Sequence, residues 1–325
     1  MGEKLRYLSR DDVISLDISM QEVIEAVEEG FRRKGMGQTQ MPPKIAIHPR
    51  GEGTFLHAMP AYVGGIDAAA VKWVGGADDN PDRGLPTISG LIIYNDPETM
   101  FPRCIMDCQW VTAMRTGAAN AVAMKYLGPE EPEVVAVVGC GVQGRSNTLA
   151  MATLYSSIRQ LRCYDVSYEA VHEYAEQTLE KYDFEVVVAD GPEDAVSEAD
   201  IVVTAGPSPR EPTPYLRDEW LKPGAMAAPV DYMGAWEGRL AQNVDKLITD
   251  DHAQMEYYRQ KGYFNNVPKP YADLGQIVAG TYPGRESSEE RTMSICMGIA
   301  VDDAVTAKLV YQAAVEQDCG TILPL

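Results

Sequence analysis

The sequence is poor in basic residues and has no long apolar run, and both shortages exclude classes of protein. It has 28 lysines and arginines against 48 aspartates and glutamates, a formal charge of −20 at pH 7. This charge repels nucleic-acid phosphates and anionic membranes, so we expect neither as a partner. No apolar run approaches the roughly 18 residues that cross a bilayer, and the opening MGEKLRYLSRDD lacks the apolar core of a signal peptide. A cytoplasmic protein is expected.

Cysteines are few, and their spacing predicts neither a disulfide framework nor a zinc site. The six are scattered among apolar residues. The closest pair, Cys104 and Cys108 in RCIMDCQW, has no histidine or cysteine cluster nearby. We therefore expect a reducing compartment, packing roles for these thiols and no bound metal. Internal repeats and low-complexity tracts are absent as well.

The first third of the sequence predicts one helix followed by a sheet. At 325 residues, 45% of them hydrophobic, the chain can bury a large core, and its length favours two domains. Ser19 is a predicted helix N-cap with Glu22 as its capping-box partner, and Gly35 ends that helix. Short β-rich runs fill 44–107 and predict a mostly antiparallel or mixed sheet. A small-residue helix over 110–128 then forms the predicted hinge.

Beyond the hinge, apolar strands alternate with helices. This alternation is typical of a parallel sheet covered on both faces. We therefore predict an α/β fold: a Rossmann-type doubly wound parallel sheet plus a mixed α+β domain. A long helix over 297–317 is expected to return to the first domain. The predicted domains are 1–115, completed by 309–325, and 116–308.

The segment VVAVVGCGVQGR places three glycines between a buried strand and a helix. Gly139 would allow a tight turn, Gly141 the approach of a pyrophosphate, and Gly144 close packing of the helix on the strand. Asp165 ends the next strand about twenty residues later, where a carboxylate binds the adenosine ribose and repels a 2′-phosphate. The loop therefore predicts NAD rather than NADP. A glycine turn without a ligand, and an N-cap role for Asp165, are the alternatives.

Several strings outside the glycine loop carry a more specific signal. They are MPPK, HAMPAY, VKWV, NPDRGLPTISGLIIYNDPET, MRTGAANAVAMKYL and GQIVAGTYPGRES. With the loop they resemble the ornithine cyclodeaminase/mu-crystallin family, which includes archaeal-type alanine dehydrogenases and ketimine reductases. The resemblance runs from about Leu8 to Val315. It implies an NAD-dependent enzyme that oxidises the Cα–N bond of an amino acid or reduces the imine, with a first domain that binds substrate and pairs as a homodimer.

The resemblance assigns the main chemical roles to three side chains. Arg115 in MRTG matches the family's carboxylate-binding arginine, and its planar fork suits a bidentate bond. Lys72 in AAVKWV matches the central lysine; burial and a nearby Arg115 would lower its pKa toward neutrality. Asp231 after AMAAPV matches the proposed general base. The plainer alternatives are a surface ion pair for the arginine, a lysine snorkelling from an edge strand, and a turn aspartate.

Further side chains complete the site that the resemblance implies. Lys44 in MPPK falls where the family's cyclodeaminases carry arginine and its alanine dehydrogenases carry lysine, which favours a dehydrogenase or imine reductase. His57 in LHAMP replaces a residue that is acidic in the former and basic in the latter, and it either touches substrate or is structural. Arg145 either bonds a phosphate or stays in solvent. The predicted cofactor contacts outside the glycines and Asp165 are Thr87, Thr116, Gln143 and Arg145.

The residues after Asp231 and near the predicted nicotinamide site depart from the family pattern. A Pro-Gly-Lys type string usually follows Asp231, whereas Met233 and Ala235 occupy the Pro and Lys places here. Ile295 and Cys296 in TMSICMGIA replace the usual phenylalanine and serine. We interpret the bulky residues as signs of a larger or more apolar substrate side chain: Tyr232, Met233 and Trp236.

Two other functions stay open. A cyclodeaminase-type lyase would form the same imine, but the substrate's own terminal amine would displace ammonia and NAD would be recycled. A non-catalytic mu-crystallin-like binder would hold a nucleotide and a hydrophobic ligand. The retained Lys72, Arg115 and Asp231 argue against the binder.

Overall fold

The computed structural model describes residues 3–51, 53–208 and 211–325, which form two compact units. The first unit runs to Arg115 and includes Ile299–Leu325; the second is Thr116–Gly298. The first boundary lies where the sequence predicted it. The second differs, because the expected division at 308/309 falls inside α10 (Ala300–Glu316). This helix packs on α2 and on β4 and β5, so its first turns belong to the first unit.

The sheet of the first unit has eight strands in the order β16-β1-β7-β6-β5-β4-β2, with β3 also paired to β4. Among the strand pairs that the described residues form, β1 with β7 is the one parallel pair, so the sheet is mixed, as the sequence predicted. Its strands are β1 (Lys4–Leu8), β2 (Thr39–Gln40), β3 (Ile45–Ile47), β4 (Thr54–Val63), β5 (Ala68–Ala77), β6 (Ile88–Asn95), β7 (Pro102–Asp107) and β16 (Thr321–Pro324).

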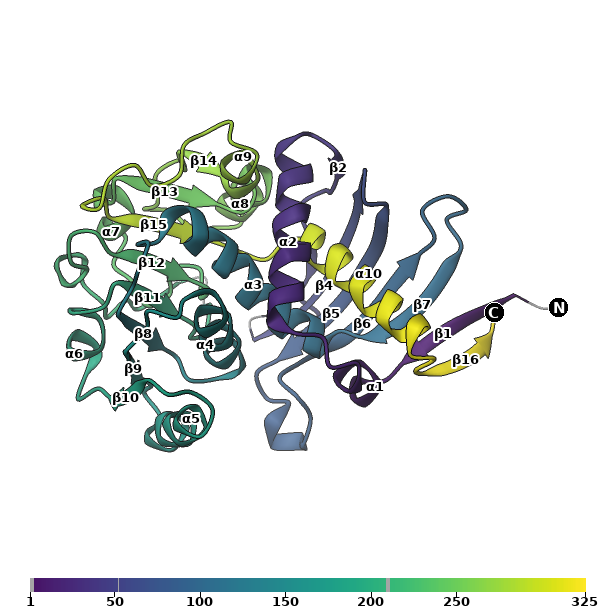
Figure 1. Cartoon of the computed structure of the whole chain (residues 1–325), viewed down its shortest axis with the longest axis horizontal. Coiled ribbons are helices and arrows are strands. Elements are labelled where there is room, and N and C mark those ends of the chain that lie inside the picture. The colour runs from purple at the N-terminus through teal and green to yellow at the C-terminus, as the bar shows by residue number, and fades with distance from the viewer. Residues whose placement is uncertain (1–2, 52, 209–210) are drawn as a thin grey trace. The chain divides into compact units, whose positions relative to one another are not determined.

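Helices α2 (Met20–Gly35) and α10 lie across one face of this sheet (Figure 1). The capping box predicted for α2 is present: the Ser19 hydroxyl accepts from the Glu22 N–H, and the Glu22 carboxylate accepts from the Ser19 N–H at 2.8 Å. Side chains alternate along a strand, so Lys72 on β5 lies on the buried face while Trp73 is 47% exposed on the other. The other helices are α1 (Arg10–Ser15) and the 3₁₀ turn η1 (Pro81–Arg83).

The second unit contains an eight-stranded sheet in the order β10-β9-β8-β11-β12-β15-β13-β14. All its pairs are parallel, which confirms the predicted fold class. Strand order reverses between β8 and β11, and ligands of open parallel sheets bind at such a switch point. The strands are β8 (Val134–Val138), β9 (Gln160–Tyr164), β10 (Glu185–Val188), β11 (Ile201–Thr204), β12 (Met226–Pro229), β13 (Lys246–Thr249), β14 (Ala272–Asp273) and β15 (Thr292–Ile295).

The helices of the second unit connect and flank these strands (Figure 1). They are α4 (Val142–Leu154), α5 (Tyr168–Leu179), α6 (Pro192–Val196), η2 (Asp218–Trp220), α7 (Arg239–Asn243), α8 (His252–Gln260) and α9 (Leu274–Val278). The hinge predicted from the small residues is α3 (Gln109–Leu127), which runs from the first unit into the second. Across the described residues, every helix is too short or too polar to cross a membrane.

Candidate active site

The glycine loop joins β8 to α4 at the carboxyl end of the parallel sheet. Gly139 has a φ of 101°, and a Cβ there would lie 2.7 Å from the carbonyl carbon of Ala205. A Cβ on Gly144 would meet the Gly139 carbonyl oxygen, so the packing of α4 requires glycine. Gly141 is the N-cap of α4, and a Cβ there would meet no other described atom within 4 Å. The loop therefore has room for an anion beside the first N–H groups of α4.

Asp165 follows β9 and connects the end of that strand to the glycine loop. Its Oδ2 accepts a hydrogen bond from the Cys140 N–H at 2.8 Å, and its Oδ1 accepts from the Ser167 N–H at 2.9 Å. The N-cap of α5 is Ser167, so the N-cap alternative for Asp165 is wrong. The carboxylate is half-buried at the carboxyl edge of the sheet.

The other two polar residues of the loop are held by protein groups. Arg145 donates from Nε to Gln177 on α5 at 2.9 Å, from a terminal nitrogen to Glu173 at 3.2 Å, and to the Cys140 carbonyl. The Gln143 carbonyl accepts from the Asn147 side chain at 2.8 Å. Arg145 therefore braces the loop against α5 and is not free in solvent, and its contact with a phosphate stays a prediction.

In the first unit, Lys72 occupies a central strand. It lies on β5 between β4 and β6, opposite Met59 and Ile92. Its side chain is 1% exposed, and Nζ donates to Oδ1 of Asp303 at 2.6 Å. Burial and the charge of Arg115 lower the pKa of Lys72 to about 8, although Asp303 opposes this shift. The edge-strand alternative is wrong, because this amine is buried, ion-paired and able to exchange protons near neutrality.

Arg115 lies on α3 among the same buried charges. Its Nε forms an ion pair with Oδ1 of Asp303 at 3.1 Å, and one terminal nitrogen lies 3.9 Å from Oδ2 of Asp302. Both aspartates are buried in the first turns of α10, where the helix N-terminus favours negative charge. The alternative of a surface ion pair is therefore wrong. Arg115 belongs to a buried group of two cations and two carboxylates.

Lys44 and His57 lie near this group in the first unit. Lys44 is buried and directly precedes β3. His57 on β4 is half-buried and packs on the Phe55 ring with 4.5 Å between centroids. Burial, together with the positive charges of Lys44, His48 and Lys72, lowers the pKa of His57 to about 3. The imidazole is therefore neutral at pH 7 and offers hydrogen-bonding groups but no charge.

Asp231 follows β12 at the carboxyl edge of the sheet of the second unit. Its Oδ1 accepts from the Thr204 hydroxyl at 2.9 Å, and its Oδ2 accepts from the Ala235 N–H at 3.1 Å. Burial raises the pKa of Asp231 to about 6, even though these hydrogen bonds favour the charged form. The Asp231 carbonyl also accepts from the Gly234 N–H at 2.9 Å, so the residue shapes a turn as well. A carboxylate of this kind can take up a proton near neutral pH.

The two threonines predicted to contact the cofactor differ in solvent exposure. Thr87 is exposed just before β6, and its carbonyl accepts from the Ala77 N–H at 3.0 Å. Thr116 is buried within α3. Their cofactor contacts stay predictions.

The comparison with known proteins settles the family. The profile of the Ornithine cyclodeaminase/mu-crystallin family matches residues 6–318. The chain belongs to this family. It is 34% identical to the alanine dehydrogenase of Archaeoglobus fulgidus, with 97% of this chain and 96% of that protein covered. Among solved structures, the Delta(1)-pyrroline-2-carboxylate reductase of Thermococcus litoralis, in complex with NADH and L-proline, has a TM-score of 0.87, 31% identity and coverage of 98% and 99%. An archaeal alanine dehydrogenase dimer with bound NAD has a TM-score of 0.86, 32% identity and coverage of 99% of both chains.

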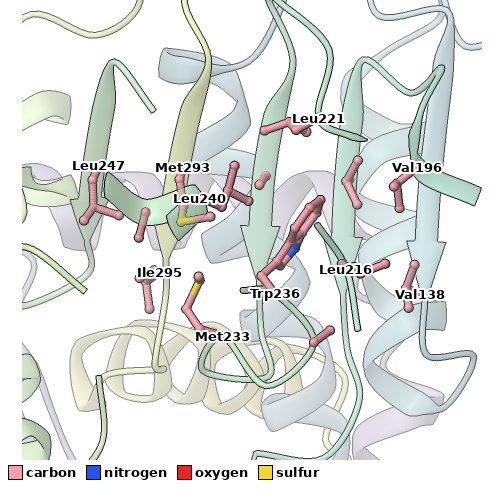
Figure 2. Close-up of a cluster of buried hydrophobic side chains, with 14 of the residues drawn as sticks. Val138, Val196, Leu216, Leu221, Met233, Trp236, Leu240, Leu247, Met293 and Ile295 are labelled. Carbon is pink, nitrogen blue, oxygen red and sulfur yellow. The ribbon is translucent and has the colours of Figure 1, made fainter. Parts of the chain in front are cut away.

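The departures of this member from the family pattern lie mostly in its core. Met233 and Trp236 point into the apolar cluster of the second unit, with Leu216 and Leu240 (Figure 2). Ala235 and Ile295 belong to the same cluster, and Cys296 is buried. Packing therefore accounts for these side chains, and they carry no argument for a larger substrate. Tyr232 is strained, with a φ of 55°, and its hydroxyl donates to the Met297 carbonyl at 2.8 Å.

Sequence reasoning missed the acidic partners and the hydroxyl that hold the predicted residues. Asp302 and Asp303 interrupt the apolar run MGIAVDDAVTAKLV, and a charge in such a run is costly unless it is paired. That signal could have identified them, because it is the one that singled out Lys72. Thr204 ends a strand of otherwise apolar residues, and its position alone does not indicate a partner.

Proposed function

We propose that this protein is an NAD(H)-dependent oxidoreductase that acts on the Cα–N bond of an amino acid or its imine. The observation that carries the proposal is the buried Lys72 amine, hydrogen-bonded to Asp303 and accompanied by Arg115, in a chain that also has a glycine loop at a sheet switch point. Two relatives support it: the alanine dehydrogenase of Archaeoglobus fulgidus and the Delta(1)-pyrroline-2-carboxylate reductase of Thermococcus litoralis.

The first unit supplies the groups that bind the acid and exchange a proton. Arg115 and Lys44 bind the α-carboxylate, with the guanidinium fork fixing its orientation. Lys72 exchanges a proton with the substrate because its pKa is lowered to about 8. In the second unit, Asp231 accepts a proton from the amine, or from the water that attacks the imine. A bound nicotinamide would supply the hydride acceptor for oxidation and the hydride donor for the reverse reaction.

The second unit supplies most of the cofactor site. The open Cβ position of Gly141 and the N-terminus of α4 fit a pyrophosphate, and Asp165 at the end of β9 fits an adenosine ribose. NAD is therefore the proposed cofactor. The residues proposed to hold it are Thr87, Thr116, Gly139, Gly141, Gln143, Gly144, Arg145 and Asp165.

The activity is tested by following NADH absorbance in both directions. The purified protein receives NAD⁺ with a panel of amino acids, and NADH with oxo acids plus ammonia or alkylamines. Stoichiometric NADH production or consumption supports the dehydrogenase or reductase. Ammonia release without NADH accumulation would instead favour the cyclodeaminase-type lyase. Binding of NAD without turnover across the panel would favour the non-catalytic binder.

Replacing Asp165 with alanine is expected to weaken NAD binding and relax discrimination against NADP. A hydrogen bond to a charged group contributes about 1.5–3 kcal/mol, so the NAD dissociation constant should rise by about 10- to 100-fold. Equilibrium binding of NADH and NADPH, followed by fluorescence, gives both constants. Asp190→Ala removes an aspartate just after neighbouring β10 and serves as the matched control. Unaltered selectivity in Asp165→Ala would refute the role of this carboxylate.

The open face of the first unit's sheet is the proposed homodimer interface, and the cytoplasm is the proposed location. Trp73 is 47% exposed and Leu91, its cross-strand neighbour, is 44% exposed. Ile45, Ile47 and Ile93 extend this exposed apolar surface along β3 and β6. Contiguous exposed apolar surface of this kind marks protein interfaces. The related archaeal alanine dehydrogenase is a dimer, which supports a second copy of this chain as the partner.

Trp73→Glu is expected to convert the dimer to monomer. A charge at the centre of an apolar interface is left unpaired and desolvated when the copies associate. Light scattering coupled to size exclusion gives the mass directly. Leu179→Glu, at the 55% exposed end of α5 in the second unit, is the control and should leave the mass unchanged. A wild-type protein that is monomeric, or a Trp73→Glu variant that remains dimeric, would contradict this interface.

A further inference from the structure

Asp303 is a buried acid of the first unit that contacts both proposed functional cations, and the roles proposed above do not use it. It lies in the second half of the first turn of α10, with a side chain that is 2% exposed. One oxygen, Oδ1, accepts from Lys72 Nζ at 2.6 Å and pairs with Arg115 Nε at 3.1 Å. The amine and the guanidinium are therefore held within reach of a single atom.

The second oxygen of Asp303 makes this arrangement unlike an ordinary ion pair. Oδ2 is buried and has no hydrogen-bond partner among the described residues. Structural arginine–carboxylate pairs commonly use both oxygens in a parallel fork. A buried carboxylate that concentrates its contacts on one oxygen has a higher free energy than a fully satisfied one. The unsatisfied Oδ2 therefore lowers the stability of the folded protein, while Oδ1 holds the Lys72 amine and the Arg115 guanidinium at one position.

We propose that Asp303 is a positioning residue that anchors Lys72 and Arg115 to one carboxylate oxygen, and so fixes the proton-exchanging amine relative to the carboxylate-binding guanidinium. This inference rests on the proposed function for its catalytic meaning. The anchoring itself is a property of the folded first unit. Asp303 does not touch the reacting atoms in this scheme; it acts through the two cations.

The charges around Lys72 explain why one anchor has to serve both cations. Two buried like charges repel, and an acid between them offsets that repulsion. The groups that face Lys72 come from several elements: Asp303 from α10, Arg115 and Thr112 from α3, Cys108 from the turn before α3, and His57 from β4. Of these, Asp303 is the negative charge in direct contact with the amine. Without Asp303, the positive charge of Arg115 would be the strongest charge acting on Lys72, and it would lower the pKa of the amine further.

The first test removes the charge of Asp303 and measures Lys72 directly. In protein carrying lysine labelled at the ε-carbon, the Lys72 signal is assigned by its loss in Lys72→Arg and titrated by NMR. The Asp303→Asn variant should titrate at lower pH than the wild type, because Arg115 still repels the charged amine. Asp302→Asn is the matched control: this neighbouring buried acid lies in the same turn and pairs with Arg115, whereas Asp303 bonds the Lys72 amine itself, so the midpoint should move less than in Asp303→Asn.

The second test follows kinetics in amino-acid oxidation. In Asp303→Asn, kcat/KM should fall by about 100-fold, as expected when a catalytic group is displaced by about an ångström. The profile of kcat/KM against pH should contain a limb that reports the titration of Lys72. In Asp303→Asn this limb should move to lower pH by the same amount as the NMR midpoint. A merely structural acid would lower thermal stability and leave both midpoints unchanged. That result would overturn the proposal.

Asp303→Glu keeps the negative charge but moves the carboxylate oxygen by one methylene. This variant therefore distinguishes the effect of the charge from the effect of the position of the oxygen. We expect a Lys72 midpoint closer to that of the wild type but a lowered kcat/KM. If Asp303→Asn does not fold, this variant decides, and a wild-type kcat/KM in Asp303→Glu would overturn the anchoring. The NMR titration needs no turnover. A shifted midpoint without activity on any amino acid would therefore reject the proposed function alone, and activity without a shifted midpoint would reject the role of Asp303 alone.

Discussion

Lys72→Ala is expected to lower kcat/KM for amino-acid oxidation by about 10²–10⁴-fold, the usual contribution of a general acid–base group. The amine is buried, lies on a central strand, and has a pKa lowered to about 8 by burial and Arg115. Lys72→Arg should be similarly impaired, since a guanidinium keeps the charge but does not release its proton near neutral pH. Steady-state kinetics with NADH detection gives the comparison.

The control for Lys72 is another buried lysine, one that lies outside the proposed site. Lys246 on β13 pairs with Glu286 at 2.6 Å in the second unit. Lys246→Ala should cost some stability, because the ion pairs of this amine with Glu286 and Glu290 are lost, and leave specific activity at the wild-type level. Thermal unfolding and NADH binding of each variant separate misfolding from loss of chemistry. Unchanged turnover in Lys72→Ala would remove this residue from the mechanism, and activity rescued by Lys72→Arg would reduce its role to charge.

The sequence predicted most of the architecture because its local signals agree with its tertiary packing. The capping box of α2, the glycines that end α3 and begin α4, and the apolar strands of the parallel sheet are all recorded in short stretches. The missed elements, such as β14, β15 and α9, are short, and neighbouring strands rather than their own pattern define them. The C-terminal boundary was misplaced because α10 is apolar enough to suit either unit, and its packing decides.

The residues of the candidate site also fall into two groups. Some can be identified from the local sequence, and others only from their contacts in the folded protein. Lys72 and Arg115 were identifiable because a charge in an apolar run has to be paired or used. Their shared acid, Asp303, lies 231 positions from Lys72 in the chain, so only the fold reveals the pairing. Met233 and Trp236 illustrate the opposite error. A bulky residue near a predicted site suggests a substrate contact, and only burial shows that it fills the core.

Asp231→Asn is expected to lower kcat/KM for oxidation by about 10²–10⁴-fold, because an amide cannot accept the proton. In the wild type, the activity should fall as the pH falls through about 6, the raised pKa of this buried carboxyl, since the protonated acid is no longer a base.

Thr204→Val offers a finer test. The Thr204 hydroxyl donates to Oδ1 at 2.9 Å and favours the charged form, so its loss should raise the pKa of Asp231 and move the acidic limb to higher pH.

The control for Asp231 is an aspartate at the opposite edge of the same sheet. Asp200 accepts from the N–H groups of Glu133 and Val134 at 2.8 and 2.9 Å, and it pairs with Lys222 at 2.7 Å. Asp200→Asn should change thermal stability without moving the pH profile, which separates a general loss of hydrogen-bonded carboxylate from the loss of this base. If Thr204→Val and wild type share the same acidic limb while Asp231→Asn is inactive, then the carboxylate is needed for its charge or shape rather than for accepting a proton. Only a limb that moves with the Thr204 hydrogen bond assigns the titration to Asp231.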